Sequence, residues 1–124
     1  SGWSQKSIMD ELHSKKKGVQ LVVEKEGRLF GWCCARVSVD EAELLKITIE
    51  KKTRRKGVGA ALLSTLEQAV KKVGCSVLFL EVRSQNKPAV KFYLNFGYFQ
   101  VGFRKNYYSL PEDDAIVLKK DIIS

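Results

Sequence analysis

The strongest constraint on the fold is a change of hydrophobic period close to Gly57. Before it, "AELLKITIE" (residues 42–50) has the β-branched and apolar composition of a strand. After it, apolar residues recur at helical spacing as far as Gly74, which predicts the C-terminal cap of a long amphipathic helix. They are Val58, Leu62, Leu66, Ala69, Val70 and Val73. "SVLFLEV" (76–82) then predicts another strand. Strand, helix and strand in succession favour a parallel crossover covered by the helix.

The flanking segments indicate a mixture of strands and helices. "VQLVVE" (19–24) and "LFGWCCARVSV" (29–39) stand on either side of the turn signal "KEGR" and predict an antiparallel hairpin. Ser4 predicts the N-cap of a short helix to residue 14, and "NKPAVKFYLNFG" (86–97) predicts a second helix with Pro88 in its first turn. "YFQVGFRKNYY" (98–108) and "DAIVLKKDI" (114–122) predict two final strands. We therefore expect a mixed α+β fold, in which helices flank a central mixed sheet.

Length and composition favour a single globular domain over residues 1–124. A chain of 124 residues has room for one domain with a core but not for two. Its 44% hydrophobic and 29% charged residues exclude a disordered or fibrous chain. No apolar stretch approaches the ~20 residues of a membrane span, and no signal peptide opens the sequence, so we expect a cytoplasmic protein.

The cysteines argue against a disulfide framework and against a metal site. Their number is odd, two are adjacent, and only His13 could join them as a ligand. We expect all of them to be reduced and to act as small hydrophobic residues: Cys33, Cys34 and Cys75.

The net charge of +8 and the pI near 9.5 indicate a polyanionic partner. Nucleic acid, a membrane surface and a phosphorylated cofactor all meet this condition. Basic residues gather at residues 15–17, 51–56 and 71–72. A solvated surface explains the first and third clusters, whereas the middle cluster directly precedes the Gly-rich start of the long helix.

The sequence R-x-x-G-x-G at this helix start predicts a cradle for a pyrophosphate. The first N–H groups of a helix have no partner within it, and with the positive end of the helix dipole they favour an anion. Gly57 and Gly59 would let a phosphate approach the backbone, and three cations would stand at the rim: Arg54, Arg55 and Lys56. No GK[ST] follows as in a P-loop, and Leu62 replaces the third glycine of a dinucleotide fingerprint. The alternative is that the glycines only form a tight turn.

In its context this stretch resembles the acetyl-CoA-binding motif of the GCN5-related N-acetyltransferase (GNAT) superfamily, which begins Q/R-x-x-G-x-G/A after the fourth strand. "LFLEVRSQNKPAVKFYLNFGY" (78–98) is similar to the strand and helix that carry L-E-V-R-x-x-N and Y-x-x-x-G-F/Y in many members. "RKNYY" (104–108) and "DDAIVL" (113–118) resemble the end of the branch that acetylates the N-terminal alanine of ribosomal proteins. The resemblance extends over residues 3–122. It implies a GNAT fold and transfer of an acetyl group from acetyl-CoA to a protein N-terminus, with a ribosomal protein as the expected acceptor.

The resemblance also implies which residues hold the cofactor. The pyrophosphate would lie on the backbone of residues 55–60, with Arg54 supporting the loop. Asn86 would contact the cofactor at the start of the next helix. The fourth strand would splay from the fifth, and the pantetheine arm would pair with its free edge. The cofactor-binding residues expected on this basis are Ile47, Thr48, Ile49, Arg54, Arg55, Lys56, Gly57, Val58, Gly59, Ala60, Asn86 and Tyr93.

The same resemblance implies a pair of catalytic residues. Members of this branch use a glutamate of the fifth strand as general base and a tyrosine of the next helix as general acid, which match Glu81 and Tyr93. Tyr107 and Tyr108 match the loop that holds the acceptor's N-terminus. Each residue has a structural alternative. Glu81 could pair with Arg83, Tyr93 could belong to the core, and the other two tyrosines could pack an exposed strand edge.

The chemistry of acetyl transfer favours such residues independently. The amine must be neutral to attack a thioester, and the departing thiolate must gain a proton. At pH 7, deprotonating an α-amine with a pKa of about 7.7–8.0 costs about 1.4 kcal/mol, whereas a lysine with a pKa of about 10.4 costs about 4.6 kcal/mol. A carboxylate that acts through a water molecule can deprotonate an α-amine more easily than a lysine, which favours an α-amine as the acceptor. Lysine or a small polyamine is the alternative acceptor.

Two further expectations concern macromolecular partners. The family fold usually opens with a strand and a helix before the segment matched by "GWSQKSIMDEL" (2–12), and we expect both to be missing. "VQLVVE" would then be an unprotected edge through which the chain could form a dimer. The alternative function is a basic nucleic-acid-binding domain with aromatic stacking platforms at Tyr98, Phe99, Phe103, Tyr107 and Tyr108. The concentration of glycines and cations at one helix start argues against it.

Overall fold

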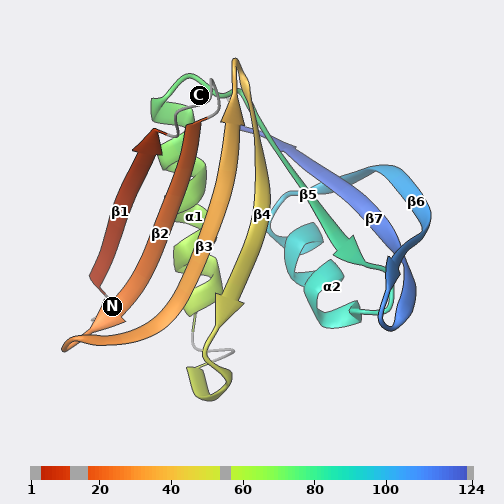
Figure 1. The fold of residues 1–124 in the computed structure, drawn as a ribbon, viewed down its shortest axis with the longest axis horizontal. Helices are drawn as coiled ribbons and strands as arrows, with labels where there is room; N and C mark the ends of the chain where they lie inside the picture. The colour runs from red at the N-terminus through yellow and green to blue at the C-terminus, as the bar shows by residue number, and fades with distance from the viewer. Residues whose placement is uncertain (1–3, 12–16, 54–56, 123–124) are drawn as a thin grey trace.

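The computed structural model describes residues 4–11, 17–53 and 57–122, with side chains from residue 18 onward apart from residue 53. Within these residues a seven-stranded sheet has the order β1-β2-β3-β4-β5-β7-β6 (Figure 1). The elements are β1 (Ser4–Glu11), β2 (Lys17–Lys25), β3 (Arg28–Ser38), β4 (Glu41–Ile49), η1 (Lys51–Thr53), α1 (Val58–Lys72), β5 (Val77–Arg83), α2 (Lys87–Asn95), β6 (Phe99–Ser109) and β7 (Glu112–Asp121). In the described ranges, no helix is long and apolar enough to cross a membrane.

The sheet is mixed, as predicted. β4 and β5 are parallel and are joined by the crossover helix α1, whereas the other neighbouring strands of the described sheet are antiparallel. The predicted hairpin of β2 and β3 is confirmed. Its two-residue turn has positive φ at Glu26 (54°) and Gly27 (79°), which matches the right-handed twist of the two strands.

The predicted helix from Ser4 is wrong, because Ser4–Glu11 forms strand β1. It runs antiparallel to β2 from the pair Ser4↔Glu24 to the pair Glu11↔Lys17. In this pairing the backbone N–H and C=O groups of the two strands form hydrogen bonds with each other. An isolated helix of this length has only marginal stability in water. The expectation of a free edge on β2 is wrong for the same reason, since β1 covers that edge. A dimer through β2 therefore has no structural basis.

The core lies between the sheet and α1. Alternate residues of β3 are buried against the helix, and those between them face the other side. The buried residues of β2, β3 and α1 are Val19, Leu21, Val23, Cys33, Ala35, Val37, Val58, Leu62, Leu63, Leu66 and Val70. The predicted helical stripe is thus confirmed, and Gly74 follows its end with φ 103°. Because burying one Leu or Val side chain contributes roughly 1.5–3 kcal/mol, this stripe is the main reason why α1 docks on the sheet.

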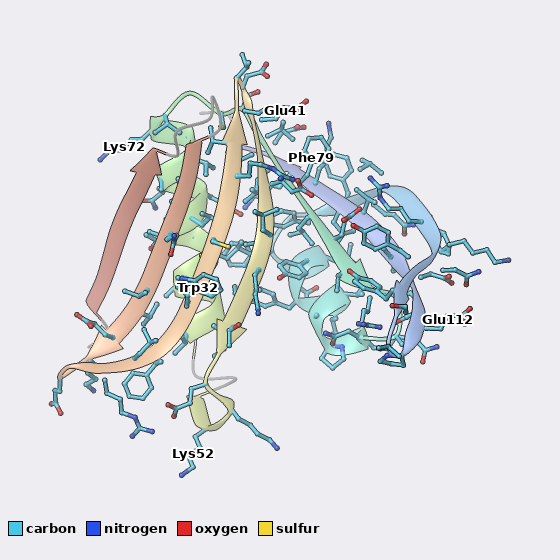
Figure 2. All side chains as sticks on the ribbon, viewed as in Figure 1. Trp32, Glu41, Lys52, Lys72, Phe79 and Glu112 are labelled. Atoms are coloured by element: carbon cyan, nitrogen blue, oxygen red, sulfur yellow. The ribbon has the colours of Figure 1, made fainter. Side chains whose placement is uncertain are left out.

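α2 lies on the same face of the sheet as α1. A Cβ added to Gly59 of α1 would stand 3.8 Å from Cζ of Phe92 on α2. Tyr98, just after α2, donates its hydroxyl to Oε2 of Glu67 on α1 at 2.8 Å. The opposite face carries no helix among the described residues, so side chains such as Phe79 stay partly open to solvent there (Figure 2). We call this side of the sheet the open face.

Candidate active site

The central feature of the site is a separation of β4 from β5. The two strands pair from Glu41↔Val77 to Leu44↔Leu80, and no pairing between them follows in the described residues. Within the part of the chain that the structure describes, the later part of β4 pairs only with β3, at Ile47, Thr48 and Ile49. Figure 1 shows the two strands diverging toward the end of β4. The splay implied by the resemblance is present, and among the described residues it leaves one edge of β4 without a neighbouring strand.

The start of α1 stands beside the open end of this splay. Gly57 is the N-cap with φ 82°, no described side chain caps the helix, and Ala61 N donates to Gly57 O at 3.0 Å. The earlier N–H groups of the first turn have no partner within the helix. A Cβ on Gly57 would meet nothing within 4 Å, so the backbone is open to a ligand. These features fit a phosphate group.

The structure describes none of the three cations expected at the rim. Arg54, Arg55 and Lys56 lie outside the described residues. Lys51 and Lys52 in the short helix η1 are exposed and place positive charge before α1. The positive charges of Lys51 and Lys52 and the positive end of the α1 dipole would both attract an anion.

Asn86 begins α2 and caps it. Its Oδ1 accepts from Ala89 N at 3.3 Å, and its backbone oxygen accepts from Val90 N at 3.0 Å. Pro88 stands in the first turn, as predicted, and Gly97 with φ 102° follows the helix end. The side chain of Asn86 is exposed and caps the start of α2. The resemblance implies that the same residue contacts the cofactor.

Tyr93 is buried beneath the sheet, on the side of the helices. Its side chain is 6% exposed, and its ring lies edge-on to those of Phe92 and Tyr98, at 5.3 Å and 5.8 Å between centroids. Burial, with a smaller contribution from Cys33, raises the pKa of Tyr93 to about 12. The hydroxyl therefore keeps its proton at neutral pH. The structure does not bring Tyr93 onto the open face with Glu81.

Glu81 faces the open side of β5, between residues that face the helices. Leu80 and Val82 are buried, and the side chain of Glu81 is 16% exposed. Its Oε2 lies 2.5 Å from Nε of Arg104 on β6. The alternative pairing with Arg83 does not occur. Arg83 instead donates to the backbone oxygen of Pro111 at 2.7 Å.

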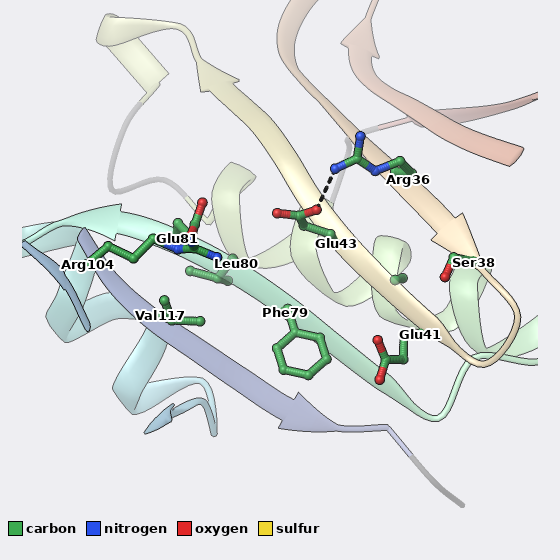
Figure 3. A pocket seen from close by; sticks show the side chains of 10 residues that line it. Arg36, Ser38, Glu41, Glu43, Phe79, Leu80, Glu81, Arg104 and Val117 are labelled. Carbon is green, nitrogen blue, oxygen red and sulfur yellow. Dashed lines mark hydrogen bonds and ion pairs between the residues drawn. The ribbon is translucent and has the colours of Figure 1, made fainter. Parts of the chain in front are cut away.

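A cavity of about 360 Å³ lies over the paired part of β4 and β5 on the open face (Figure 3). Glu81 and Arg104 stand at one end, and Glu41 stands at the other. Between them Arg36 donates to Oε1 of Glu43 at 2.8 Å. The lining contains three carboxylates and two guanidinium groups, so in an otherwise basic chain this pocket has a local excess of negative charge.

Sequence reasoning missed most of this pocket. Arg36, Glu41 and Glu43 alternate with buried residues of β3 and β4, a pattern that marks a second sheet face. That alternation was the available signal. Arg104 had no comparable signal, because its approach to Glu81 depends on the register of three strands.

Tyr108 completes the group around Glu81. Burial raises its pKa, and the carboxylate of Glu81 raises it further, against an opposing effect of Arg83. The guanidinium of Arg83 lies 4.2 Å from the centroid of the Tyr108 ring. Tyr107 is half exposed, packs edge-on to Tyr108 with 5.1 Å between centroids, and lies under Arg104 at 5.4 Å. The structure thus places Tyr108 within the electrostatic influence of Glu81, and it places Tyr107 beside Arg104, the ion-pair partner of Glu81.

The three cysteines are free thiols, and Cys33 and Cys75 are buried. Among the described residues no cluster of three or more His, Cys, Asp or Glu side chains could hold a metal ion.

Comparison with known proteins agrees with this geometry. The sequence matches the Acetyltransferase (GNAT) family over residues 2–98. The ribosomal protein bS18-alanine N-acetyltransferase of Escherichia coli (strain K12) is 31% identical over 118 residues, which cover 94% of this chain and 78% of that protein. A Bacillus subtilis protein provisionally named for the same activity is 34% identical over 118 residues, which cover 95% of this chain and 78% of the relative.

Solved structures show the same fold. The ribosomal-protein-S18-alanine N-acetyltransferase from Escherichia coli superposes with a TM-score of 0.80 at 30% identity, over 86% of this chain and 70% of that one. A GNAT family acetyltransferase from Elizabethkingia anophelis with acetyl-CoA bound has a TM-score of 0.79 over 84% of this chain and 76% of that one. At 16% identity, this second likeness supports the fold alone. The chain therefore belongs to the Acetyltransferase (GNAT) family and is an acetyl-CoA-dependent N-acetyltransferase with the GNAT fold.

Proposed function

We propose that the protein acetylates the N-terminal α-amine of a protein, with a ribosomal protein in the cytoplasm as the acceptor. The observation that carries the proposal is the position of Glu81. Its carboxylate stands at the end of an acidic pocket and next to the point where β4 and β5 separate. The names of the relatives from Escherichia coli and Bacillus subtilis support this acceptor.

The cofactor would lie between the start of α1 and the free edge of β4. Bound acetyl-CoA supplies the thioester that is attacked. The backbone of residues 55–60 would hold its pyrophosphate, with support from Arg54 and the positive end of the helix dipole. The unpaired edge of residues 47–49 offers backbone groups to the amides of the pantetheine arm. Asn86 and Tyr93 would line the opposite wall from α2.

Glu81 would act as the general base. An incoming α-ammonium group loses its proton toward the carboxylate, through a water molecule, and the neutral amine then attacks. Because the α-amine has a pKa of about 7.7–8.0, the cost of about 1.4 kcal/mol at pH 7 is well within the reach of one carboxylate. Tyr108 and the ring of Tyr107 would hold the acceptor backbone beside it.

Tyr93 would donate the proton that the leaving sulfur needs. With a pKa of about 12, Tyr93 is a weaker acid than an ordinary thiol, whose pKa is about 8.5. Proton transfer from Tyr93 to such a thiolate would therefore cost about 5 kcal/mol. Burial that raises the pKa of a phenol also raises that of a thiol. A thiolate formed next to the Tyr93 hydroxyl would therefore be a stronger base than in water, which reduces this cost.

The same pocket supports one alternative acceptor. Its excess of carboxylates would attract any ammonium group, including a lysine side chain or a small polyamine. The α-amine is preferred because a lysine adds about 3 kcal/mol to the cost of deprotonation at neutral pH.

One experiment tests the cofactor and the acceptor together. Acetyl-CoA should raise the thermal midpoint of the protein, and mass spectrometry should find acetylation on peptides that begin with Ala, Ser or Met. Matched peptides with a blocked N-terminus and one internal lysine, and spermidine, serve as competing acceptors. Acetylation of the blocked peptide or of spermidine at an equal rate would contradict the α-amine proposal. Absence of stabilisation by acetyl-CoA would contradict the cofactor site.

A further inference from the structure

β6 contains two residues more than β7 beside the pocket. Arg104 pairs with Ala115 and Tyr108 pairs with Asp113, so that residues 105–107 lie opposite Asp114 alone. In the middle of this bulge Asn106 has φ 54°, in the left-handed region that non-glycine residues seldom occupy. Asparagine tolerates it better than most residues.

The bulge determines how close Tyr108 comes to Arg104. In a regular strand four residue steps span about 13 Å, at roughly 3.3 Å per residue. Here the two residues lie opposite positions of β7 that are two steps apart, which corresponds to about 7 Å. Because the number of extra residues is even, both side chains stay on the same face. The bulge therefore draws Tyr108 toward the pair formed by Arg104 and Glu81.

The side chain of Asp114 holds the bulge in place. Its Oδ1 accepts from Asn106 N at 2.8 Å and so replaces the ladder hydrogen bond that the bulge interrupts. The backbone of Asp114 is itself fixed on both sides. Its N–H donates to Oδ1 of Asp113 at 2.7 Å, and its oxygen accepts from Ser84 N at 2.9 Å.

We propose that Asp114 is a positioning residue for acceptor binding, because it fixes the bulge at Asn106 that brings Tyr108 and Tyr107 toward the ion pair of Glu81 and Arg104. This inference rests on the proposed function of the open-face pocket and adds to it a residue that touches neither substrate. The cofactor site at the start of α1 lies on a different part of the fold. Loss of the Asp114 contact should therefore weaken acceptor binding and leave cofactor binding unchanged.

The test compares Asp114→Ala, Asp114→Asn and the control Glu112→Ala, an exposed carboxylate on the same strand. Asparagine keeps an oxygen that accepts the Asn106 N–H, so it separates the hydrogen bond from the charge. Acetyl-CoA affinity is measured by calorimetry and acceptor kinetics by steady-state rates. Hydrogen exchange follows the amides of residues 104–109. Whichever amine the wild-type protein acetylates serves as the acceptor, so a failure of the α-amine proposal leaves this comparison intact.

Asp114→Ala should raise the acceptor KM about tenfold, the order expected for one hydrogen bond, speed exchange at residues 104–109 and leave acetyl-CoA affinity unchanged. Asp114→Asn should recover most of the loss, and Glu112→Ala should behave as wild type. An unchanged acceptor KM in Asp114→Ala, or an equal loss in Asp114→Asn, overturns the proposal. Should Asp114→Ala lose its cooperative thermal transition, Asn106→Ala tests the same bulge, because alanine disfavours the left-handed conformation. It should raise the acceptor KM as well, and an unchanged KM contradicts the inference.

Discussion

Glu81 and Arg104 form an ion pair across β7, with Oε2 and Nε 2.5 Å apart. The two side chains differ in freedom, because that of Arg104 is 59% exposed and that of Glu81 is 16% exposed. The guanidinium of Arg104 regains contact with water when it leaves the pair, whereas the mostly buried carboxylate of Glu81 still needs a cationic partner. We therefore expect an incoming ammonium group to replace Arg104 as the partner of the Glu81 carboxylate, which would give that carboxylate a cationic partner both before and after the acceptor binds.

Glu81→Gln should abolish the base and preserve the cofactor site. The amide keeps the size of the side chain but accepts no proton, so kcat/KM should fall by roughly 10²–10⁴. Acetyl-CoA affinity, measured by calorimetry, should remain that of the wild type. The matched control is Glu43→Gln, which removes another carboxylate of the pocket and one that pairs with Arg36. Turnover that survives in Glu81→Gln, or falls equally in Glu43→Gln, would remove Glu81 from this role.

Gly57→Val should disrupt both the conformation and the ligand site at the start of α1. With φ 82° this position is strained for any residue with a Cβ, at a cost of roughly 1–2 kcal/mol in the free energy of unfolding. The side chain would also fill the open space in which a phosphate is expected. Gly74→Val is the control, because Gly74 has φ 103° and equally open surroundings at the other end of α1. Both variants should be less stable by thermal denaturation, but only Gly57→Val should lose acetyl-CoA in calorimetry. Equal cofactor affinities in the two variants would contradict the cradle.

Local patterns predicted the strands and helices from β2 to β7, and non-local pairing decided the conformation of β1 and the registers of the strands. The stripe from Val58 to Val70 repeats within one helix, so its burial follows from spacing alone. The helix predicted from Ser4 depended on a cap and on Ile8, Met9 and Leu12 as one face, whereas the conformation of Ser4–Glu11 depends on its pairing with β2. A local helix signal at Ser4 carried no information about that pairing, which is why the prediction failed there.

The candidate site also contains one residue that a local pattern predicts and one that depends on non-local pairing. Glu81 could be placed from its strand, because alternation on β5 separates it from Leu80 and Val82. Its partner could not, since Arg104 reaches it only through the pairing of β5 with β7 and of β7 with β6. Arg83 was the nearest cation in the sequence, and the structure turns it toward Pro111 instead. Register therefore determined the electrostatic surroundings of the candidate base.

Tyr93→Phe should reveal whether the buried hydroxyl donates a proton. Phenylalanine keeps the ring contacts with Phe92 and Tyr98, so the thermal midpoint should change little. If Tyr93 is the general acid, kcat should fall by roughly 10²-fold while acetyl-CoA affinity stays the same. Tyr98→Phe is the control. It removes the hydroxyl that donates to Glu67 at 2.8 Å and should lower stability by about 1–3 kcal/mol without lowering kcat. An unchanged kcat in Tyr93→Phe would leave that residue with a packing role only.

Cys33 should make the protein sensitive to alkaline pH. Burial, with a smaller effect of Cys34, raises the pKa of the Cys33 thiol from 9.0 to about 12. Between these values the unfolded chain releases a proton that the folded chain keeps, so the free energy of unfolding falls as pH rises. The contribution is fully present below pH 9 and is lost toward pH 12, about 4 kcal/mol in all.

The measurement is denaturant unfolding of the wild type and Cys33→Ala at intervals from pH 8 to pH 10. Cys33→Ala should be less stable at pH 8 because it leaves a small cavity, but its stability should fall less steeply above pH 9. The pKa of Cys75 is also raised by burial, and that of Tyr93 is raised to about 12. Both groups are present in each protein, so the difference in slope reports the ionisation of Cys33 together with its smaller effect on Tyr93. Cys34→Ala, on the opposite face of β3, should keep most of the wild-type slope. Parallel curves for the wild type and Cys33→Ala over this range would mean that the thiol ionises in the folded protein as readily as in the unfolded chain.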